Sequence, residues 1–426
     1  MKLRRLNLLL LLGISASLAQ AGASMDDWLL PNLALRLSVN VSNPGPARVH
    51  ALATLPLAKA RAVAPDFPGR LAIALLVNPA GSSRPASVIA SQSDDLDGDG
   101  TPDQFEFPVD LAPGEQRRVD IYFSTTLSDT ITWPKRVQSK HGYGYNRQVA
   151  TLESELVGYR TYGGFFFDMM GRPAGNFGLN NDTAAYIPVF SDLGTGRDVF
   201  HIGNSLGLGG IFLRRADKVY QPPMNIPDYA HRASPVMSPH YRIIAQGPLR
   251  AMFETVLSDW TIDGDVVRLQ AQYSIDAGEP FIRCRFEAVP VQVAAGHEYE
   301  VGIGVRDLPA ESLLPGTGHI VLTGKQNERD GVIGLGLFFD PRQFAPTAQV
   351  RTPESMNRAV IATERLKPGS TVRGQYTVCG AWSGSGIAEP GAYLATLSEA
   401  IAATVTVDDL RLTHTPRPDR VDAEAQ

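Results

Sequence analysis

The sequence contains only two cysteines, Cys284 and Cys379, among its 426 residues. Their wide separation along the chain excludes the C-x-x-C spacing of redox and zinc motifs. Two cysteines can form a disulfide in an oxidising compartment, but the geometry of the pair does not follow from sequence. A disulfide and two buried free thiols are therefore both compatible with the sequence.

Long apolar runs are also absent after the N-terminus, which excludes a later membrane-spanning helix. The N-terminus itself carries three basic residues, Lys2, Arg4 and Arg5, followed by an apolar stretch from Leu6 to Leu12. Ala19-Gln20-Ala21 then provides an A-x-A cleavage site. Residues 1–21 are predicted to be a secretory signal peptide, and no cysteine follows the apolar stretch to carry a lipid anchor. We expect a periplasmic or secreted protein without a membrane anchor.

The chain has no excess of positive charge. Removing residues 1–21 leaves 36 basic against 44 acidic residues, a net charge of −8. This balance disfavours nucleic acid and anionic membranes as main partners. The sequence gives no indication of the oligomeric state.

The familiar catalytic motifs are missing as well. The sequence has no P-loop, no H-E-x-x-H and no close pairing of cysteine with histidine. Ser205 lacks the nucleophile elbow of a serine hydrolase, and Gly207-Leu-Gly209 lacks the strand–turn–helix context of a dinucleotide site. No reaction is therefore assigned by motif alone.

The pattern that is present is alternation of apolar and polar residues, with few convincing helical stretches, so we expect an all-β protein. Residues 22–130 are predicted to form a small β-sandwich. Its strands include Leu35–Ser42, Leu71–Val77 and Arg117–Phe123, separated by turns rich in proline and glycine.

Residues 131–415 are predicted to form a larger antiparallel β domain of two stacked sheets. Alternation is clear over Arg250–Leu257, Val266–Ile275 and Phe281–Glu287, and Asp263-Gly264-Asp265 predicts a hairpin turn between the first two. One helix is expected at 393–403, before a last strand at 405–412. Residues 416–426 are expected to be a C-terminal tail.

An acidic loop occurs within the small domain. The residues from Asp95 to Glu106 fit the calcium-loop pattern D-x-[DN]-x-[DN]-G-x5-E at every defined position. Calcium takes six to eight oxygen ligands. The predicted ligands are Asp95, Asp97, Asp99, Thr101 (through its backbone carbonyl), Asp103 and Glu106. Pro102 and the strand-like Phe105–Val109 favour a structural Ca²⁺ loop between strands over a helix–loop–helix sensor; the alternative is an acidic turn without metal.

Polar residues with catalytic potential gather in four segments of the larger domain: 153–162, 200–210, 238–242 and 379–386. They supply the residue types that β-elimination of a uronic acid requires. In this reaction a cation or amide neutralises the carboxylate, and a tyrosine or histidine transfers the proton. The candidates for the carboxylate are Arg160, Arg242 and Asn204. The candidates for proton transfer are Tyr159, Tyr241, His201 and His240.

Other interpretations stay open. Glu153 with Glu155 or Asp168 would suit a glycosidase, because residues two apart on a strand face the same way at about 7 Å. A non-catalytic protein would instead bind sugar by stacking on Trp382 and tyrosines such as Tyr162. Glu153, Glu155, Tyr162 and Trp382 are thus candidate substrate-binding residues. Each candidate also has a structural interpretation, as a packed aromatic, a satisfied histidine or an ion-paired charge.

Several segments resemble one family of secreted bacterial proteins, domain-of-unknown-function family 4861. The segments are Asp94–Phe105, Leu111–Glu115, Glu153–Tyr162 and His201–Gly207, in this order. The resemblance implies a β-supersandwich like that of galactose mutarotases and many polysaccharide lyases. It also implies a setting among enzymes that degrade uronic-acid polymers. The resemblance implies no catalytic residues.

Together these features predict a secreted protein that acts on uronic-acid-containing poly- or oligosaccharide by β-elimination. A glycoside hydrolase and a carbohydrate-binding protein are the alternatives. An acidic saccharide is the expected partner.

Overall fold

The computed structural model describes residues 28–30, 32–46, 48–78, 86–125, 132–144, 147–161, 163–173, 197–223, 239–327, 331–403 and 405–414. The predicted signal peptide, Tyr162 and the tail after residue 416 lie outside these residues. In the described part the protein is nearly all β, as expected, and its sheets are antiparallel. No described helix is long and apolar enough to cross a membrane.

The small domain is a sandwich of two sheets around its own apolar core. One sheet has the strand order β27-β1-β7-β3-β4 and the other β2-β6-β5. Their bounds are β1 (Leu35–Ser42), β2 (Val49–Pro56), β3 (Ile73–Val77), β4 (Ser87–Ile89), β5 (Gln92–Asp94), β6 (Gln104–Leu111), β7 (Gln116–Phe123) and β27 (Thr406–His414). A short helix, α1 (Leu57–Val63), buries Leu57 and Ala60 in the same core.

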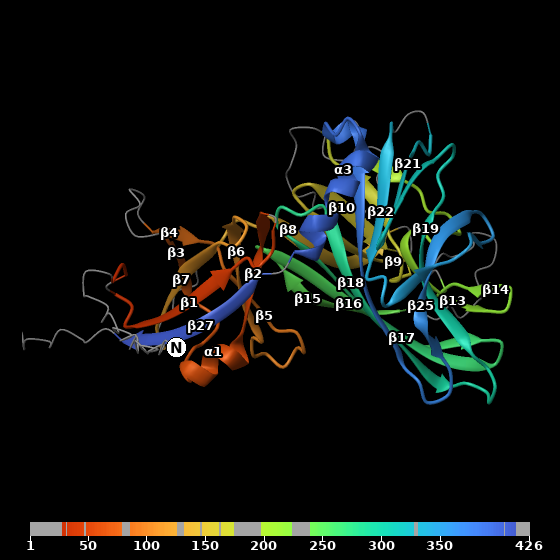
Figure 1. Ribbon diagram of the computed structural model, residues 1–426. Coiled ribbons are helices and arrows are strands. Elements are labelled where there is room, and N and C mark those ends of the chain that lie inside the picture. The colour runs from red at the N-terminus through yellow and green to blue at the C-terminus, as the bar shows by residue number, and fades with distance from the viewer. Residues whose placement is uncertain are drawn as a thin grey trace, which may run out of the picture.

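The last strand corrects the predicted domain boundary. The sequence places 405–412 with the large domain, but β27 runs back and pairs with β1 along its length. Figure 1 shows this blue strand lying among the red and orange strands of the small domain. Val407 contributes to the small-domain core, so the small domain is built from both ends of the chain.

The large domain stacks one broad sheet on two narrower ones. The broad sheet has the order β15-β16-β17-β18-β26-β22-β21-β20. Its bounds are β15 (His240–Gln246), β16 (Arg250–Ile262), β17 (Asp265–Asp276), β18 (Phe281–Gln292), β20 (Ser312–Gly316), β21 (His319–Gly324), β22 (Ile333–Phe339) and β26 (Val372–Trp382). The expected hairpin between β16 and β17 is present, with Asp263 and Gly264 both at positive φ.

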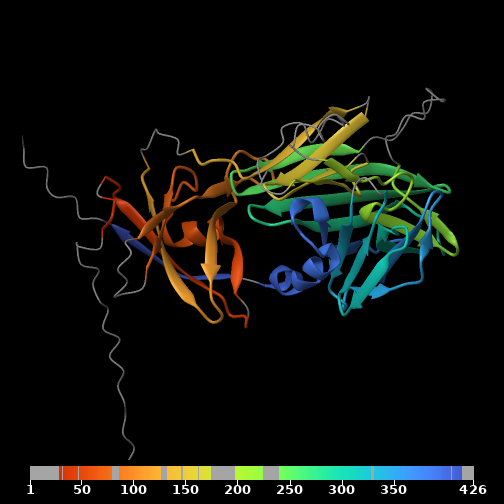
Figure 2. The same cartoon turned by 90° about the horizontal axis from the view of Figure 1, so that it is seen from above.

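Two smaller sheets cover one face of the broad sheet. Their orders are β12-β11-β10-β9-β8 and β14-β13-β19-β25-β23, with β24 paired to β25. Their bounds are β8 (Val137–Gly144), β9 (Arg147–Ser154), β10 (Val157–Thr161), β11 (Asp168–Gly171), β12 (Arg197–Phe200), β13 (Leu208–Arg215), β14 (Lys218–Tyr220), β19 (Tyr299–Arg306), β23 (Phe344–Pro346), β24 (Val350–Arg351) and β25 (Met356–Leu366). Figure 2 shows the yellow strands of the first sheet layered on the green strands of the broad sheet.

Alternation along the strands decides what faces the core. On β17, Leu269, Ala271 and Tyr273 are buried between the sheets, whereas Gln270 and Gln272 face the opposite side. Two short helices, α3 (Pro390–Thr396) and α4 (Ser398–Ala402), replace the single helix expected at 393–403. They pack with residues of β21, β22 and β26 and cover that part of the outer face.

The two cysteines are buried free thiols. Cys284 on β18 faces the core between the sheets, whereas Cys379 on β26 faces the helices on the other side. Since the two side chains emerge from opposite faces of one sheet, they cannot pair without a change of register.

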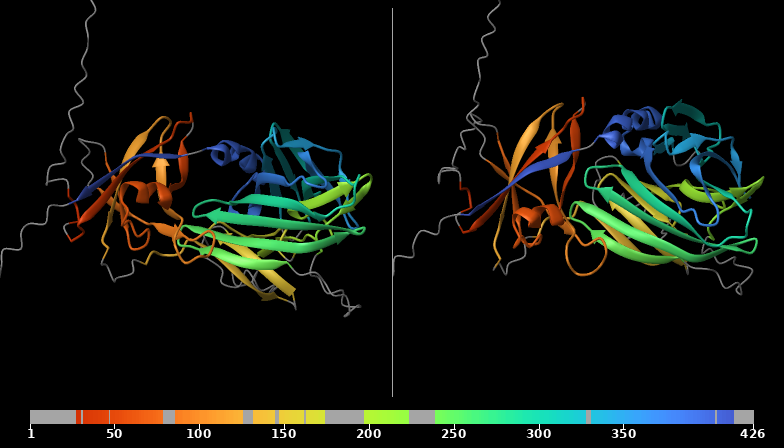
Figure 3. Two further views of the ribbon diagram at one scale, coloured as in Figure 1. Left: turned by 90° about the horizontal axis from the view of Figure 1, so that it is seen from below. Right: turned by 60° about the horizontal axis from the view of Figure 1, so that its bottom comes forward.

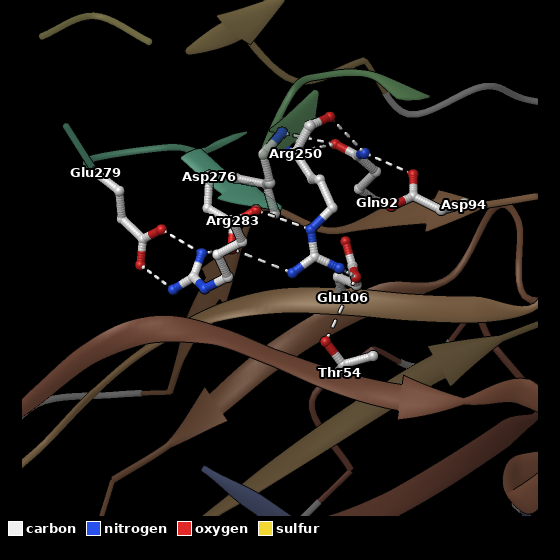
Figure 4. Close-up of polar contacts among 9 residues, drawn as sticks. Thr54, Gln92, Asp94, Glu106, Arg250, Asp276, Glu279 and Arg283 are labelled. Carbon is white, nitrogen blue, oxygen red and sulfur yellow. Dashed lines mark hydrogen bonds and ion pairs between the residues drawn. The ribbon is translucent and has the colours of Figure 1, made fainter. Parts of the chain in front are cut away.

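A buried polar network joins the two domains (Figure 4). Arg250, at the start of β16, forms an ion pair with Glu106 of β6. It also donates two hydrogen bonds to the Asp276 carboxylate, from Nε at 2.8 Å and from Nη2 at 3.1 Å. Gln92 of β5 accepts hydrogen bonds from the backbone N–H groups of Leu249 and Arg250 and donates to the Arg250 carbonyl. Figure 3 shows the orange small-domain strands and loop lying against the green strands at this junction.

Candidate functional site

The acidic loop after β5 has the geometry of a cation-binding turn. One carboxylate oxygen from each of Asp95, Asp97 and Asp99 lies within 4.8 Å of the others. Asp95 accepts hydrogen bonds from the backbone N–H groups of Gly98 and Gly100, both at 2.7 Å, which holds the loop closed. Gly100 has φ +90°, a conformation that favours glycine. The donor set therefore fits a hard cation such as Ca²⁺.

The structure corrects the last predicted ligand. Glu106 is fully buried on β6, where it forms an ion pair with Arg250 and accepts a hydrogen bond from Thr54. It is not part of the carboxylate group formed by the three aspartates. Asp103 accepts a hydrogen bond from the Leu96 N–H at 2.7 Å, and Thr101 lies in the turn, donating its N–H to Asp99. Glu106 therefore fits the calcium-loop pattern in sequence, whereas in the structure its carboxylate contacts Arg250 at the junction of the two domains.

Tyr159 is a core residue and is not available for proton transfer. Its side chain is fully buried on β10, and its hydroxyl donates to the Pro280 carbonyl at 2.5 Å and accepts from the Gly380 N–H at 2.8 Å. Burial raises the pKa of the Tyr159 phenol well above its ordinary value. The hydroxyl therefore ties β10 to the broad sheet.

Arg160, the predicted carboxylate holder beside it, is also buried. Its guanidinium contacts Asp168 at 2.6 Å and Asp198 at 3.0 Å. These contacts also remove Asp168 as a glycosidase residue, because its carboxylate is committed to the buried arginine. Arg160 of β10 instead anchors Asp198 of β12, which lies on the far side of β11.

His201 and Asn204 do come together with charged groups. His201 follows β12 and is half-exposed, with its Nδ1 3.8 Å from Asp198 Oδ2. Arg306, at the end of β19, donates to the His201 carbonyl at 2.8 Å, and Gln326 donates to the same oxygen. Asn204 donates its backbone N–H to Glu354 at 2.9 Å. We call Asp198, His201, Asn204, Arg306 and Glu354 the His201 cluster.

Burial shifts the pKa values of two members of the His201 cluster. Burial raises the pKa of Asp198, while the positive charges of Arg160 and His201 oppose that rise. Burial also lowers the pKa of Arg306, and Glu354 opposes this shift. The half-exposed imidazole therefore lies near a carboxylate that a buried arginine holds, and the Arg306 guanidinium contacts the backbone carbonyl of the same histidine.

The third predicted segment lies elsewhere and does not complete this cluster. His240 is exposed on β15, and Tyr241 packs against His141 of β8 with ring centroids 4.9 Å apart. Since β8 and β12 are the two edges of the five-stranded sheet, about 19 Å separates the regions. The Tyr241 hydroxyl is buried without a hydrogen-bond partner among the described residues, and burial raises the pKa of this phenol.

Arg242 is an interface residue. Its guanidinium donates to Glu254 at 3.2 Å and to the Leu96 carbonyl of the acidic loop at 3.0 Å. Arg242 and Tyr241 therefore lie apart from the His201 cluster, and the roles predicted for them, holding a carboxylate and transferring a proton, stay predictions.

The predicted glutamate pair is not assembled. Glu153 is fully buried and contacts Arg172 at 2.6 Å, whereas Glu155 forms an ion pair with Arg136. Strand β9 ends at Ser154, so the alternation that would place the two carboxylates on one face stops between them. Both glutamates have structural roles.

Trp382 ends β26 and packs against the main core. Its indole lies over Gly171 and Gly384. A Cβ atom added to Gly171 or Gly384 would lie 2.4 or 2.3 Å, respectively, from an atom of the indole ring. With Met169, Pro280 and Tyr393 it lines a narrow pocket of about 190 Å³. Trp382 therefore covers part of the core, and its stacking on a sugar stays a prediction.

Sequence reasoning missed Asp198, Arg306 and Glu354. Asp198 carried a local signal, because it lies three positions before His201. Arg306 and Glu354 come from distant segments, joined to the cluster by the pairing of β19 with β13 and β25. No spacing in the sequence links them to His201.

A known protein family matches most of this chain. The model of the family described as Domain of unknown function (DUF4861) matches residues 82–407. The chain belongs to this family. The match begins after the first strands of the small domain and includes the acidic loop and the His201 cluster.

A distant relative and two solved structures are similar to this chain. This DUF4861 protein is 25% identical over 250 residues to Uncharacterized protein P7 of Formosa agariphila. That match covers 53% of this chain and 57% of the relative, so the chain spans little more than half of its length. Two Enterococcus faecalis structures, an α-mannosidase and a glycosyl hydrolase family 38 protein, align with 88% of this chain at 7% and 8% identity. Both have a TM-score of 0.47, with 46% and 47% of their own chains covered.

Proposed function

We propose that this DUF4861 protein is a secreted carbohydrate-active enzyme that acts on uronic-acid-containing saccharides by β-elimination at the His201 cluster. The observation that carries the proposal is the half-exposed His201 imidazole, 3.8 Å from an Asp198 carboxylate that is itself fixed by buried Arg160. This arrangement supports a histidine that exchanges protons with a bound ligand.

His201 would act as the base. In elimination at a uronate, the imidazole takes the proton from the carbon beside the carboxylate. The electron pair forms a carbon–carbon double bond, and the glycosidic oxygen leaves from the adjacent carbon. The leaving oxygen then receives a proton from the imidazolium or from water. Asp198 would stabilise the imidazolium, and the 3.8 Å contact would shorten as charge develops.

Arg306 and Asn204 would hold the substrate carboxylate. Arg306 uses one nitrogen for the His201 carbonyl, and its other N–H groups make no hydrogen bond to any described residue, although the charge of Glu354 acts on the guanidinium. The side-chain amide of Asn204 makes no hydrogen bond to any part of the chain that the structure describes. A cation and an amide beside the base are the groups that stabilise a developing enolate.

Calcium is part of the proposal as a structural ion. Asp95, Asp97 and Asp99 would hold it, and Arg242 would transmit its stabilising effect to β15 through the Leu96 carbonyl. Since the loop lies in the small domain, Ca²⁺ would stabilise the domain junction and take no part in the reaction.

The test is a substrate screen on the mature protein with uronic-acid poly- and oligosaccharides. Ultraviolet absorbance reports unsaturated uronate, and mass spectrometry reports released sugars. We expect a new chromophore that is lost in His201→Gln and reduced at least 100-fold in Asp198→Asn. His240→Gln, which changes an exposed histidine on β15, is the matched control and should retain turnover.

Other results would contradict this mechanism. Shorter sugars without a chromophore would indicate hydrolysis. Saturable binding without any product would indicate a carbohydrate-binding protein. Full turnover in His201→Gln would exclude the His201 cluster as the reaction centre.

A further inference from the structure

A second polar site lies on the outer face of the broad sheet. A cleft of about 610 Å³ opens over three adjacent strands, β17, β18 and β26, with one wall from the residues after β22 and from β25. Its floor is polar because the side chains that alternate away from the core point into it: Gln270, Gln272, Arg285, Glu287, Arg373 and Gln375. The cleft is separate from the His201 cluster, none of whose members lines it.

The floor residues form two cross-strand rows. Gln272 pairs with Arg285, which pairs with Gln375, and the neighbouring row consists of Gln270, Glu287 and Arg373. Arg373 and Glu287 neutralise each other at 3.0 Å. Arg285 is different: its exposed guanidinium has no ion pair or hydrogen bond with any described residue. One uncompensated cation therefore lies in the middle of a row of amides.

The glutamines beside Arg285 are held in one orientation. Glu254, nearly buried on β16, accepts hydrogen bonds from Gln270 Nε2 at 2.7 Å and Gln272 Nε2 at 2.9 Å. These hydrogen bonds, and one from Arg242, lower the pKa of Glu254 against the effect of its burial, so it stays ionised and can only accept. Both amide nitrogens therefore face Glu254, and the amide oxygens are left as acceptors for a ligand.

We propose that this cleft is a second binding site for acidic saccharides, with Arg285 as the group that contacts a carboxylate or sulfate. The preset amide oxygens of Gln270 and Gln272 would accept hydrogen bonds from sugar hydroxyls. The lining contains three arginines and two glutamates, which contrasts with the net negative charge of the whole chain. This inference shares only the ligand class with the proposed reaction, and it needs no chemistry in the cleft.

The experiment is calorimetric titration of the full mature protein at low salt. The probes are a uronate tetrasaccharide, a sulfated tetrasaccharide of similar length and a neutral mannotetraose. Titrations are made in the His201→Gln background as well as in wild type, so that turnover does not obscure binding. We expect Arg285→Ala to weaken binding of at least one acidic probe by 10-fold or more, with little change for the neutral sugar.

Two variants make the result specific. Arg411→Ala removes one exposed arginine from β27 of the small domain and matches the change in net charge; it should bind like the parent. Gln272→Glu places a second carboxylate beside Glu254 and Arg285, and it should weaken acidic probes while leaving Arg285 present. The uronate and sulfate arms decide which acidic group is preferred.

The proposal fails if wild type binds neither acidic probe at millimolar concentration. It also fails if Arg285→Ala binds both acidic probes as tightly as Arg411→Ala. These outcomes are distinct from failure of the proposed reaction, because His201→Gln tests turnover and Arg285→Ala tests binding in a separate part of the fold.

Discussion

Glu106 of the small domain forms a buried ion pair with Arg250 of the large domain. The same guanidinium holds Asp276, and Asp276 in turn holds Arg283, which also contacts Glu279 (Figure 4). Each domain is built around its own apolar core. The two domains are joined by a charged network in which Glu106 is fully buried. Such a junction is sensitive to the loss of any one partner, because an unpaired buried charge is costly.

The first prediction concerns this junction. Arg250→Ala should lower the free energy of unfolding by about 3–5 kcal/mol, since it leaves Glu106 and Asp276 as buried carboxylates without their main cation. Urea unfolding followed by tryptophan fluorescence measures the change. Arg411→Ala should stay within about 0.5 kcal/mol of wild type. Equal stability of the two variants would show that the network contributes little.

Mutations can separate the effect of calcium on stability from the effect of the Glu106–Arg250 ion pair. We expect a chelator to lower the melting temperature of wild type and to have no effect on Asp97→Ala, which lacks one of the three converging carboxylates. Glu106→Gln should reduce stability but keep the wild-type calcium affinity, because Glu106 contacts Arg250. Thermal unfolding with and without Ca²⁺, together with calcium titration, measures both effects. A melting temperature that chelation leaves unchanged would exclude a structural calcium ion.

Asp94 should make stability depend on pH. Burial raises the pKa of Asp94 from 3.8 to about 6, and one of its carboxylate oxygens is buried with no hydrogen-bond partner that the structure describes. The folded protein therefore holds this proton more tightly than the unfolded chain does. The resulting stabilisation is complete below about pH 3.8 and is lost as the pH rises through about 6.

Asp94→Asn removes this titration. Relative to wild type, the variant should gain stability between pH 5 and pH 7.5, on the order of 1–3 kcal/mol, because one pKa unit corresponds to about 1.4 kcal/mol. Unfolding curves at several pH values in this range measure the difference. If the two proteins kept a constant difference in stability across that range, Asp94 would not be the titrating group.

The two tyrosines should respond differently to loss of the hydroxyl. Tyr159→Phe leaves the Pro280 carbonyl and the Gly380 N–H without their partner, so we expect a loss of about 1–3 kcal/mol. Tyr241→Phe removes a buried hydroxyl that bonds to no residue in the described part of the chain, so the change should be neutral or slightly stabilising. Thermal unfolding compares the pair. Tyr241→Phe should also keep full turnover. A marked loss of activity would show that Tyr241 takes part in the reaction.

Much of the secondary structure was predictable because it depends on local patterns. Leu35–Ser42 alternates and forms β1 over the same residues, and Asp263-Gly264 supplies the positive φ that its hairpin requires. The location of β27 was not predictable from its own residues. An alternating strand can pair with any free edge, and only the exposed edge of β1 determined that 406–414 returns to the small domain.

The candidate site residues also combine features that local sequence predicts with features that only the tertiary structure decides. Tyr159 and Arg160 have the right residue types for elimination, yet both are buried and satisfied by Pro280, Gly380, Asp168 and Asp198. Residue type and spacing do not determine which face of a strand packs against the core. His201 and Asn204 remained candidates because the chain after β12 leaves the sheet and stays partly exposed.

The sequence by itself determined the all-β class, the strand alternation, the turns and the acidic loop, because each depends on side-chain period or on the backbone conformation of a few neighbouring residues. Only the tertiary structure decided that Glu106 pairs with Arg250 and that Arg306 joins His201. It also places Arg285 in a polar cleft without an ion pair to any described residue. These relationships depend on strand register and sheet packing, which bring together residues that are distant in the chain and fix which charges meet a partner.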